Sequence, residues 1–410
     1  MRNHYILILI LVTFFVISLL TNIMGPLVPE IIEDFDLNLT MVAVLPFSFF
    51  LAYGIMSIPS GILVEKLGEK RIMMLAFSIA CFGALTLAIY ANYLVAIVSL
   101  FLIGSGMTML QVAINPLLRT AGGKEHFAFY SVLGQLCFGL ASFASPLLYS
   151  QVVTGLESNG QGTATRLLSG LVPHNQSWIA MYWIFAAVSL LMVGVISLSR
   201  FPTVSLQEDE KVESNRVYFQ LLKDPKVILY FLGIFFYVGT EQGVNNWISE
   251  FLQTYHGYDP QTIGARVVSR FWGFMTVGTL LGLLLLKLID SRKVLVFFTL
   301  AAIASLTAAL FGGSSIVLIA FPMVGFSASV MWSIILSLAL NSVKHHHGAL
   351  SGILVTGIIG GALLPLAIGA IGDVVGLRAG LLILYFSLGY IFAIGFWSKP
   401  LVANKTLNFK

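Results

Sequence analysis

Long apolar segments recur along the whole chain and constrain its fold more than any other feature. Each is long enough to cross a bilayer as a helix, because about 20 apolar residues span the hydrocarbon core. We place twelve of them at 5–28, 41–64, 72–91, 93–118, 127–153, 179–200, 226–254, 261–286, 294–311, 315–340, 349–372 and 379–397. The sequence therefore predicts an all-α membrane protein with twelve transmembrane helices and both termini on one side.

The placement of charged residues predicts how these helices are oriented. Only 10% of the 410 residues are charged, against about 25% in soluble domains, so a soluble enzyme is excluded. Nothing in the sequence indicates nucleic-acid binding. With a cytoplasmic amino terminus, all but four of the 22 basic residues fall in cytoplasmic segments. The exceptions are Arg166, Arg266, Arg270 and Arg378. This positive-inside asymmetry predicts cytoplasmic termini and a plasma membrane, the inner membrane of a bacterium.

Two long polar segments interrupt the apolar pattern and divide the chain. Residues 154–178 form a Gly- and Ser-rich outer loop, and residues 201–225 form a charged cytoplasmic linker. The linker separates an amino-terminal half, 1–200, from a carboxy-terminal half, 226–410, with six predicted helices in each. Two six-helix halves around a central cavity are a common plan for secondary transporters.

The segment YVGTEQGVNNWISEFL, residues 237–252, places a carboxylate where water should be scarce. Glu241 lies about 21 Å along a helix that enters lipid near Val227. A lone carboxylate at that depth costs roughly 2.5–3.5 kcal/mol, so it should face a cavity, a partner or an ion. The same segment supplies four more candidates for contact with a small, hydroxyl-rich ligand: Gln242, Asn245, Asn246 and Trp247. The alternative for these polar side chains is hydrogen bonding between helices.

Later helices add aromatic and basic candidates. Trp272 and Trp332 could stack on the apolar face of a sugar, although tryptophan near helix ends also marks the membrane interface. Arg270 either extends to the outer interface, or neutralises Glu241, or binds an anionic substrate. The two cysteines and the histidine run at 345–347 give no metal-ligand pattern. We therefore predict no metal site and no cofactor.

The segment PSGILVEKLGEKR, residues 59–71, lies between the second and third predicted helices. It resembles the cytoplasmic signature of the major facilitator superfamily, in which a glycine and an acid are followed by a glycine and basic residues. The resemblance implies a conformational latch at the inner face made by Gly61, Glu65, Lys70 and Arg71. Glutamate stands here in place of the usual aspartate, and an ordinary basic loop is the alternative. Such a latch should stabilise the outward-open state.

Three further segments extend the resemblance. They are TNIMGPLVP in the first helix, IGSGMTMLQVAINPLL at 103–118, and SGILVTGIIGGALLPLAIGAIGD at 351–373. With these segments the chain resembles, over nearly all twelve helices, the fucose permease family of sugar–cation symporters. The resemblance implies a major facilitator fold and a substrate cavity. It adds four residues to the cavity-lining candidates of the seventh helix: Asn22, Gln111, Asn115 and Gln135.

Two departures from the fucose-type pattern concern ion coupling. Fucose-type members carry an acid where this chain has Gly25, and a glutamate where it has Gln111. Both acids implicated in proton coupling are therefore missing, which disfavours fucose as the substrate. Glu241 is left as the deepest carboxylate and becomes the candidate for cation coupling, with Na⁺ or H⁺ as the co-transported ion. A sodium-linked hexose branch of the family is then a candidate relative.

These observations predict a function in transport. The leading hypothesis is import of a neutral monosaccharide, a hexose, by cation-coupled symport and alternating access. No covalent chemistry is expected, so the chain is predicted not to be an enzyme. Export of a drug-like or lipid-like compound is the alternative within transport, and a membrane receptor or enzyme on a transporter scaffold is a third option. The expected partners are the sugar, the cation and the lipid bilayer, with the protein acting as a monomer.

Overall fold

The computed structural model describes residues 4–122, 127–158, 163–173, 176–201, 215–343 and 347–401. Twelve helical segments of this part are long and apolar enough to cross a membrane. The prediction of twelve membrane spans is thereby confirmed. Most of the predicted linker and parts of the loop 154–178 lie outside the described residues, as do His345 and His346. The division at 201–225 and the cytoplasmic placement of the termini stay predictions.

The helices before the linker account for the first six spans. They are α1 (His4–Thr21), α2 (Met24–Phe35), α3 (Leu39–Leu67), α4 (Glu69–Ile89), α5 (Tyr93–Gly122), α6 (Phe127–Glu157), the short α7 (Thr163–Ser169), the 3₁₀ turn η2 (Ser177–Ile179) and α8 (Ala180–Leu198). The first span, formed by α1 and α2, runs to Phe35. It therefore extends beyond the end of the predicted first span, 5–28, through Glu30, Glu33 and Asp34.

The helices that follow account for the other six spans. They are α9 (Asn215–Leu222), α10 (Pro225–His256), the π turn η4 (Pro260–Gly264), α11 (Ala265–Leu288), α12 (Ser291–Phe311), α13 (Ser314–Ala328), α14 (Met331–Leu340), α15 (His347–Thr356), the 3₁₀ turn η5 (Gly357–Ile359), α16 (Gly360–Val375), α17 (Leu377–Leu381) and α18 (Ile383–Trp397). The short α9 precedes the first span of this group and does not cross the membrane.

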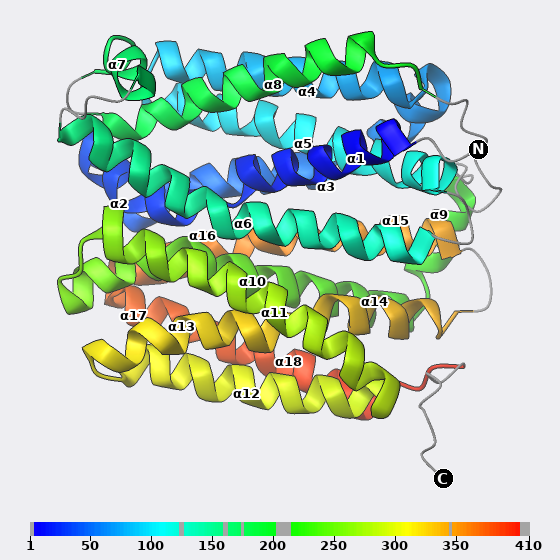
Figure 1. The fold of residues 1–410 in the computed structure, drawn as a ribbon. Helices are drawn as coiled ribbons and strands as arrows, with labels where there is room; N and C mark the ends of the chain where they lie inside the picture. Colours follow the sequence, from blue (N-terminus) through cyan, green and yellow to red (C-terminus); the bar gives the residue numbers. More distant parts are fainter. Residues whose placement is uncertain are drawn as a thin grey trace.

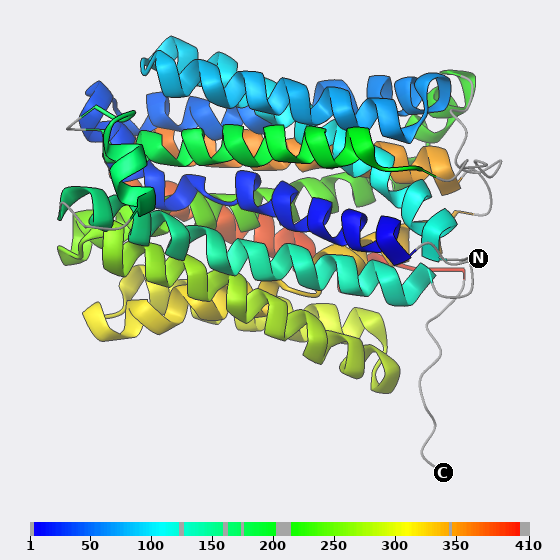
Figure 2. The same ribbon diagram turned by 45° about the horizontal axis from the view of Figure 1, so that its top comes forward.

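The two groups of helices lie side by side as two halves (Figure 1). Their long helices run along one common direction, as the turned view of Figure 2 also shows. The start of α1 and the end of α18 lie at the same end of the bundle, which we name the terminal end. The opposite end, where α2 stops and α3 begins, is named the far end.

Close helix packing depends on glycine at a few positions. A Cβ added to Gly104 of α5 would lie 2.3 Å from the Phe49 carbonyl oxygen of α3, and one on Gly360 of α16 would lie 1.9 Å from the Phe235 carbonyl oxygen of α10. Neither helix pair could approach this closely with a side chain there. Glycine at these two positions thus lets α5 pack closely on α3 and α16 on α10.

Polar contacts join the two halves at the far end. The Asp373 carboxylate, at the end of α16, accepts hydrogen bonds from the backbone N–H groups of Leu39 (2.8 Å) and Thr40 (2.9 Å), which begin α3. Two amides of the second half also donate to carboxylates of the first, Gln253 to Glu33 and Gln261 to Glu157. The halves are therefore hydrogen-bonded together at the far end.

Candidate functional site

Glu241 lies at the middle of the 32-residue helix α10. The Tyr237 hydroxyl donates to Glu241 Oε2 at 2.5 Å, and Gln242 Nε2 donates to Oε1 at 3.1 Å. Both donors are neutral and buried. Among the residues that the structure describes, Glu241 has no ion pair, and the exposed Arg270 does not neutralise it. Because two carboxylate oxygens can accept about four hydrogen bonds, Glu241 keeps lone pairs for a further ligand.

The three predicted aromatic residues occupy different environments. Trp332, just after the interruption between α13 and α14, is partly exposed, and its ring centroid lies 6.1 Å from that of Tyr237. Trp272 and Trp247 are buried, and Trp247 Nε1 donates to the Pro365 carbonyl oxygen of α16 at 3.3 Å. Trp247 thus makes a hydrogen bond between helices, which is the alternative to a role in sugar binding. Its role in sugar binding stays a prediction.

Asn245 and Asn246 form a buried amide pair on α10. Asn245 Nδ2 donates to Asn246 Oδ1 at 3.1 Å, and Trp272 Nε1 of α11 donates to Asn245 Oδ1 at 2.8 Å. The Nδ2 atom of Asn246 is buried and has no partner among the described residues. Three of the predicted site residues are thus connected to one another, and one of them retains free hydrogen-bond donors.

The start of α2, just after Asn22, brings the first half into contact with this region. Asn22 stands at the interruption between α1 and α2, and its Nδ2 donates to Ser142 Oγ of α6 at 2.9 Å. Three residues later, a Cβ added to Gly25 would lie 2.4 Å from the Asn245 carbonyl oxygen. The helix interruption at Asn22 therefore lies close to the amide pair of α10. Interrupted helices at a repeat interface are typical of transporter substrate sites.

The remaining amide candidates lie on α5 and α6. Gln111 is partly exposed, whereas Asn115 and Gln135 are exposed. Asn115 Nδ2 donates to the Gln111 carbonyl oxygen at 3.3 Å, within the same helix. No hydrogen bond connects these three side chains to the Glu241 group in the described part of the chain. Their contribution to a substrate cavity stays a prediction.

Sequence reasoning did not name two tyrosines that the structure brings into consideration. Tyr237 holds Glu241, and the i,i+4 spacing of the two residues was a sufficient signal. Tyr53 lies at the centre of α3, where its buried hydroxyl has no hydrogen-bond partner among the described residues. No sequence pattern distinguished Tyr53 from other aromatic residues of these helices.

The latch candidates lie at the terminal end. Lys70 Nζ donates to the carbonyl oxygens of Ser197 and Ser199, both at 2.8 Å, so it binds the end of α8 within its own half. Glu65 and Arg71 are exposed, Gly61 is partly so, and the described residues include no ion pair between Glu65 and either base. The latch between the halves therefore stays a prediction.

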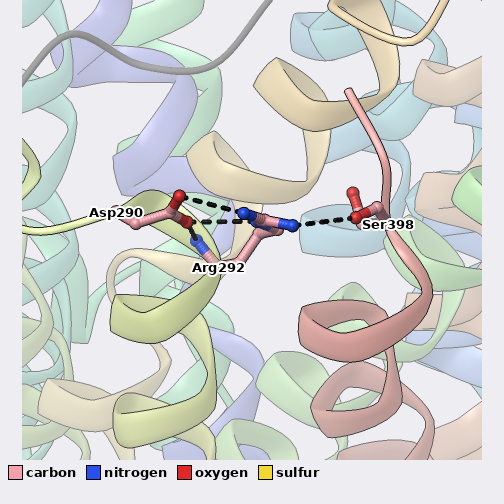
Figure 3. Close-up of polar contacts among 3 residues, drawn as sticks. All are labelled: Asp290, Arg292 and Ser398. Atoms are coloured by element: carbon pink, nitrogen blue, oxygen red, sulfur yellow. Dashed lines mark hydrogen bonds and ion pairs between the residues drawn. The ribbon is translucent and has the colours of Figure 1, made fainter. Parts of the chain in front are cut away.

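The second half has a comparable contact at the same end. Arg292 binds Asp290 through its side chain at 3.1–3.2 Å and donates to the Ser398 carbonyl oxygen after α18 (Figure 3). Hydrogen bonds from Arg292 hold the pKa of Asp290 below its ordinary value. A basic residue thus ties the third helix of each half to the end of the sixth. No group of three or more potential metal ligands occurs among the described residues.

Comparison with known proteins places this arrangement in a family. The chain is 30% identical over 387 residues to the glucose/galactose transporter of Brucella abortus, covering 92% of this chain and 90% of the relative. It is 25% identical over 383 residues to the L-fucose-proton symporter of Escherichia coli, with coverages of 88% and 86%. The fold matches the crystal structure of the transporter FucP in the outward conformation with a TM-score of 0.67, at 22% identity and coverages of 96% and 98%.

A family model for the Major Facilitator Superfamily matches residues 10–364, which is most of the chain. The twelve membrane-spanning helices and the two facing halves agree with that match. The chain belongs to the Major Facilitator Superfamily.

Proposed function

We propose that this protein imports a neutral hexose together with Na⁺ or H⁺ by alternating access between its two halves. Its twelve apolar helices and its family make it a multi-pass transporter of the bacterial inner membrane and not an enzyme. The names of its relatives, a glucose/galactose transporter and an L-fucose-proton symporter, support a sugar as the cargo.

The environment of Glu241 carries the proposal of cation coupling. A ligand shifts a conformational equilibrium only by its different affinity for the two states. Glu241 is held by two neutral donors, Tyr237 and Gln242, and by no fixed cation among the described residues. A mobile cation can therefore neutralise it. Na⁺ would use the carboxylate with nearby amide or carbonyl oxygens, whereas H⁺ would convert it to a neutral acid.

The surroundings of Glu241 support a hydroxyl-rich cargo over an apolar one. The amides of Gln242, Asn245 and Asn246 lie within five residues of it on the same helix, and the partly exposed Trp332 packs beside Tyr237. Sugar sites combine a few placed polar groups with an aromatic surface. Export of a drug-like or lipid-like compound would call for a more apolar set of side chains.

The test compares uphill transport with exchange in proteoliposomes. Glu241→Gln should abolish accumulation of labelled hexose against its gradient while leaving counterflow measurable, because the amide cannot bind a proton and holds Na⁺ poorly. Asp36→Asn is the matched control, since it removes an exposed carboxylate at the far end, and should accumulate sugar normally. Replacing sodium by choline at constant pH then identifies the cation. A Glu241→Gln protein that still concentrates hexose would rule out this mechanism.

A further inference from the structure

Trp272 makes one hydrogen bond that fixes the orientation of a neighbouring amide. The side chain is 4% exposed, and its Nε1 donates to Asn245 Oδ1 over 2.8 Å. An indole N–H group can only donate a hydrogen bond. The Asn245 amide must therefore turn its oxygen toward Trp272 and its nitrogen away from it.

This orientation is passed on to Asn246. Asn245 Nδ2 donates to Asn246 Oδ1 at 3.1 Å, so the bond occupies the oxygen of the second amide. The Asn246 side chain is 2% exposed, and its Nδ2 has no partner among the described residues. A buried donor without a partner is unfavourable. The last side chain in this series of hydrogen bonds, Asn246, therefore has two N–H groups on Nδ2 that should bind an acceptor oxygen.

We propose that Trp272 is a positioning residue that, through Asn245, turns the N–H groups of Asn246 toward a hydroxyl oxygen of the transported hexose. The inference rests on the proposed function and names one hydrogen-bond donor for it. It also separates the roles of two tryptophans. Trp332 is partly exposed and is suited to contact the sugar ring, whereas the ring of Trp272 is buried and acts through its N–H group.

The chain of amides lies against the other half of the protein. The close approach of Gly25 to the Asn245 carbonyl oxygen places α2 directly against the backbone of Asn245, the residue between Trp272 and Asn246 in this series of hydrogen bonds. When the far end opens, α2 must move away from α10, and the Asn245 backbone then loses its contact with α2. The contact from Asn246 to the sugar should therefore differ between the two states, which is what substrate-linked alternation requires.

The test uses the full-length protein in proteoliposomes and measures binding of glucose, galactose and their monodeoxy derivatives by inhibition of exchange. Trp272→Phe keeps an aromatic ring and removes the N–H group. We expect about two- to tenfold weaker binding of the parent hexose, the effect of one hydrogen bond. One deoxy sugar, which lacks the contacted hydroxyl, should bind the variant as well as it binds the wild type. Asn246→Ala should show the same pattern.

A double variant and a matched control make the test decisive. Trp272→Phe with Asn246→Ala should bind no more weakly than Asn246→Ala alone, because both changes remove the same contact. Trp183→Phe is the control, since the Trp183 indole N–H is also buried but has no partner among the described residues. It should bind every sugar like the wild type. If Trp272→Phe does not fold, Asn245→Ala interrupts the same chain and should give the same deoxy-sugar pattern.

Two results would overturn the inference while leaving the proposed function standing. One is equal weakening of all the deoxy sugars by Trp272→Phe, which would make the residue purely structural. The other is additive loss in the double variant. A wild-type protein that binds no hexose would remove the proposed function itself, together with the positioning role that depends on it.

Discussion

Replacing Asp373 by asparagine should release the far end of the bundle. Its carboxylate crosses between the halves to the start of α3 and accepts hydrogen bonds from the backbone N–H groups of Leu39 and Thr40 and, at 2.5 Å, from the Thr40 hydroxyl. The first N–H groups of a helix have no partner inside the helix. A negative charge there is also favourable to the helix dipole. Asp373→Asn keeps the shape but removes the charge and one acceptor oxygen.

The size of the effect follows from these two losses. A charge at an exposed helix amino terminus contributes about 0.3–1 kcal/mol, and a hydrogen bond about 0.5–1.5 kcal/mol. Together they stabilise the closed far end by about 1–2 kcal/mol, which changes a two-state ratio by a factor of roughly 5–30. The variant should therefore populate a state with an open far end much more than the wild type does.

Spin-label distances can measure this shift. Ser158, just after α6, and Thr254 of α10 are exposed residues of opposite halves, and cysteines there carry the labels once Cys81 and Cys137 have been replaced by serine. Pulsed dipolar spectroscopy should show a larger population of long distances in Asp373→Asn.

The matched control is Asp34→Asn. Asp34 accepts a hydrogen bond from Trp178 Nε1 within its own half, so the substitution removes a far-end charge without changing a contact between the halves. It should leave the distance distribution unchanged. An unchanged distribution in Asp373→Asn, or an equal shift in Asp34→Asn, would refute the reasoning.

Two further variants test contacts at opposite ends of the bundle. Gly25→Ala would place a Cβ 2.4 Å from the Asn245 carbonyl oxygen, so it should lengthen the same spin-label distance; a wild-type distribution would contradict this close approach. Asp290→Asn should lower the free energy of unfolding at pH 7 by less than about 1 kcal/mol, because the site is partly exposed. Because Arg292 lowers the pKa of Asp290 in the folded state, its stabilisation is present above the ordinary Asp pKa of about 3.9 and is lost as pH falls through the lower folded value. A difference between Asp290→Asn and wild type that persists at still lower pH would contradict the ion-pair explanation.

Sequence reasoning succeeded with the membrane spans because hydrophobic length is a local property. It failed at the end of the first span. The predicted span stops at residue 28, yet α2 continues through Glu30, Glu33 and Asp34 to Phe35. The reason is tertiary, since the Tyr149 hydroxyl donates to Glu30 and the Trp178 indole donates to Asp34. Neither donor, both more than a hundred residues away in sequence, could be assigned to these acids from a local pattern.

The candidate site was predictable only where its residues share one helix. The cluster around Glu241 is visible in the sequence because Tyr237, Gln242 and the asparagines lie on α10. The bond from Trp272 to Asn245 joins two helices, and its direction depends on how they pack. Sequence comparison treated Gly25 as a missing acid. The structure gives the position a packing role as well, because a side chain there would collide with the backbone of α10.

The packing of Gly25 bears on how coupling could work without the two acids of the fucose-type pattern. An acid at that place would meet the Asn245 carbonyl oxygen whenever the far end is closed as it is here. Glycine instead lets α2 press on α10 one turn beyond Glu241, and Gln253 binds Glu33 of α2 further along the same helix. The proposed cation and sugar sites are both on α10, the helix that α2 must leave when the far end opens. In the proposed mechanism, coupling passes through the contact between α2 and α10, with the titratable or ion-binding group on α10 alone.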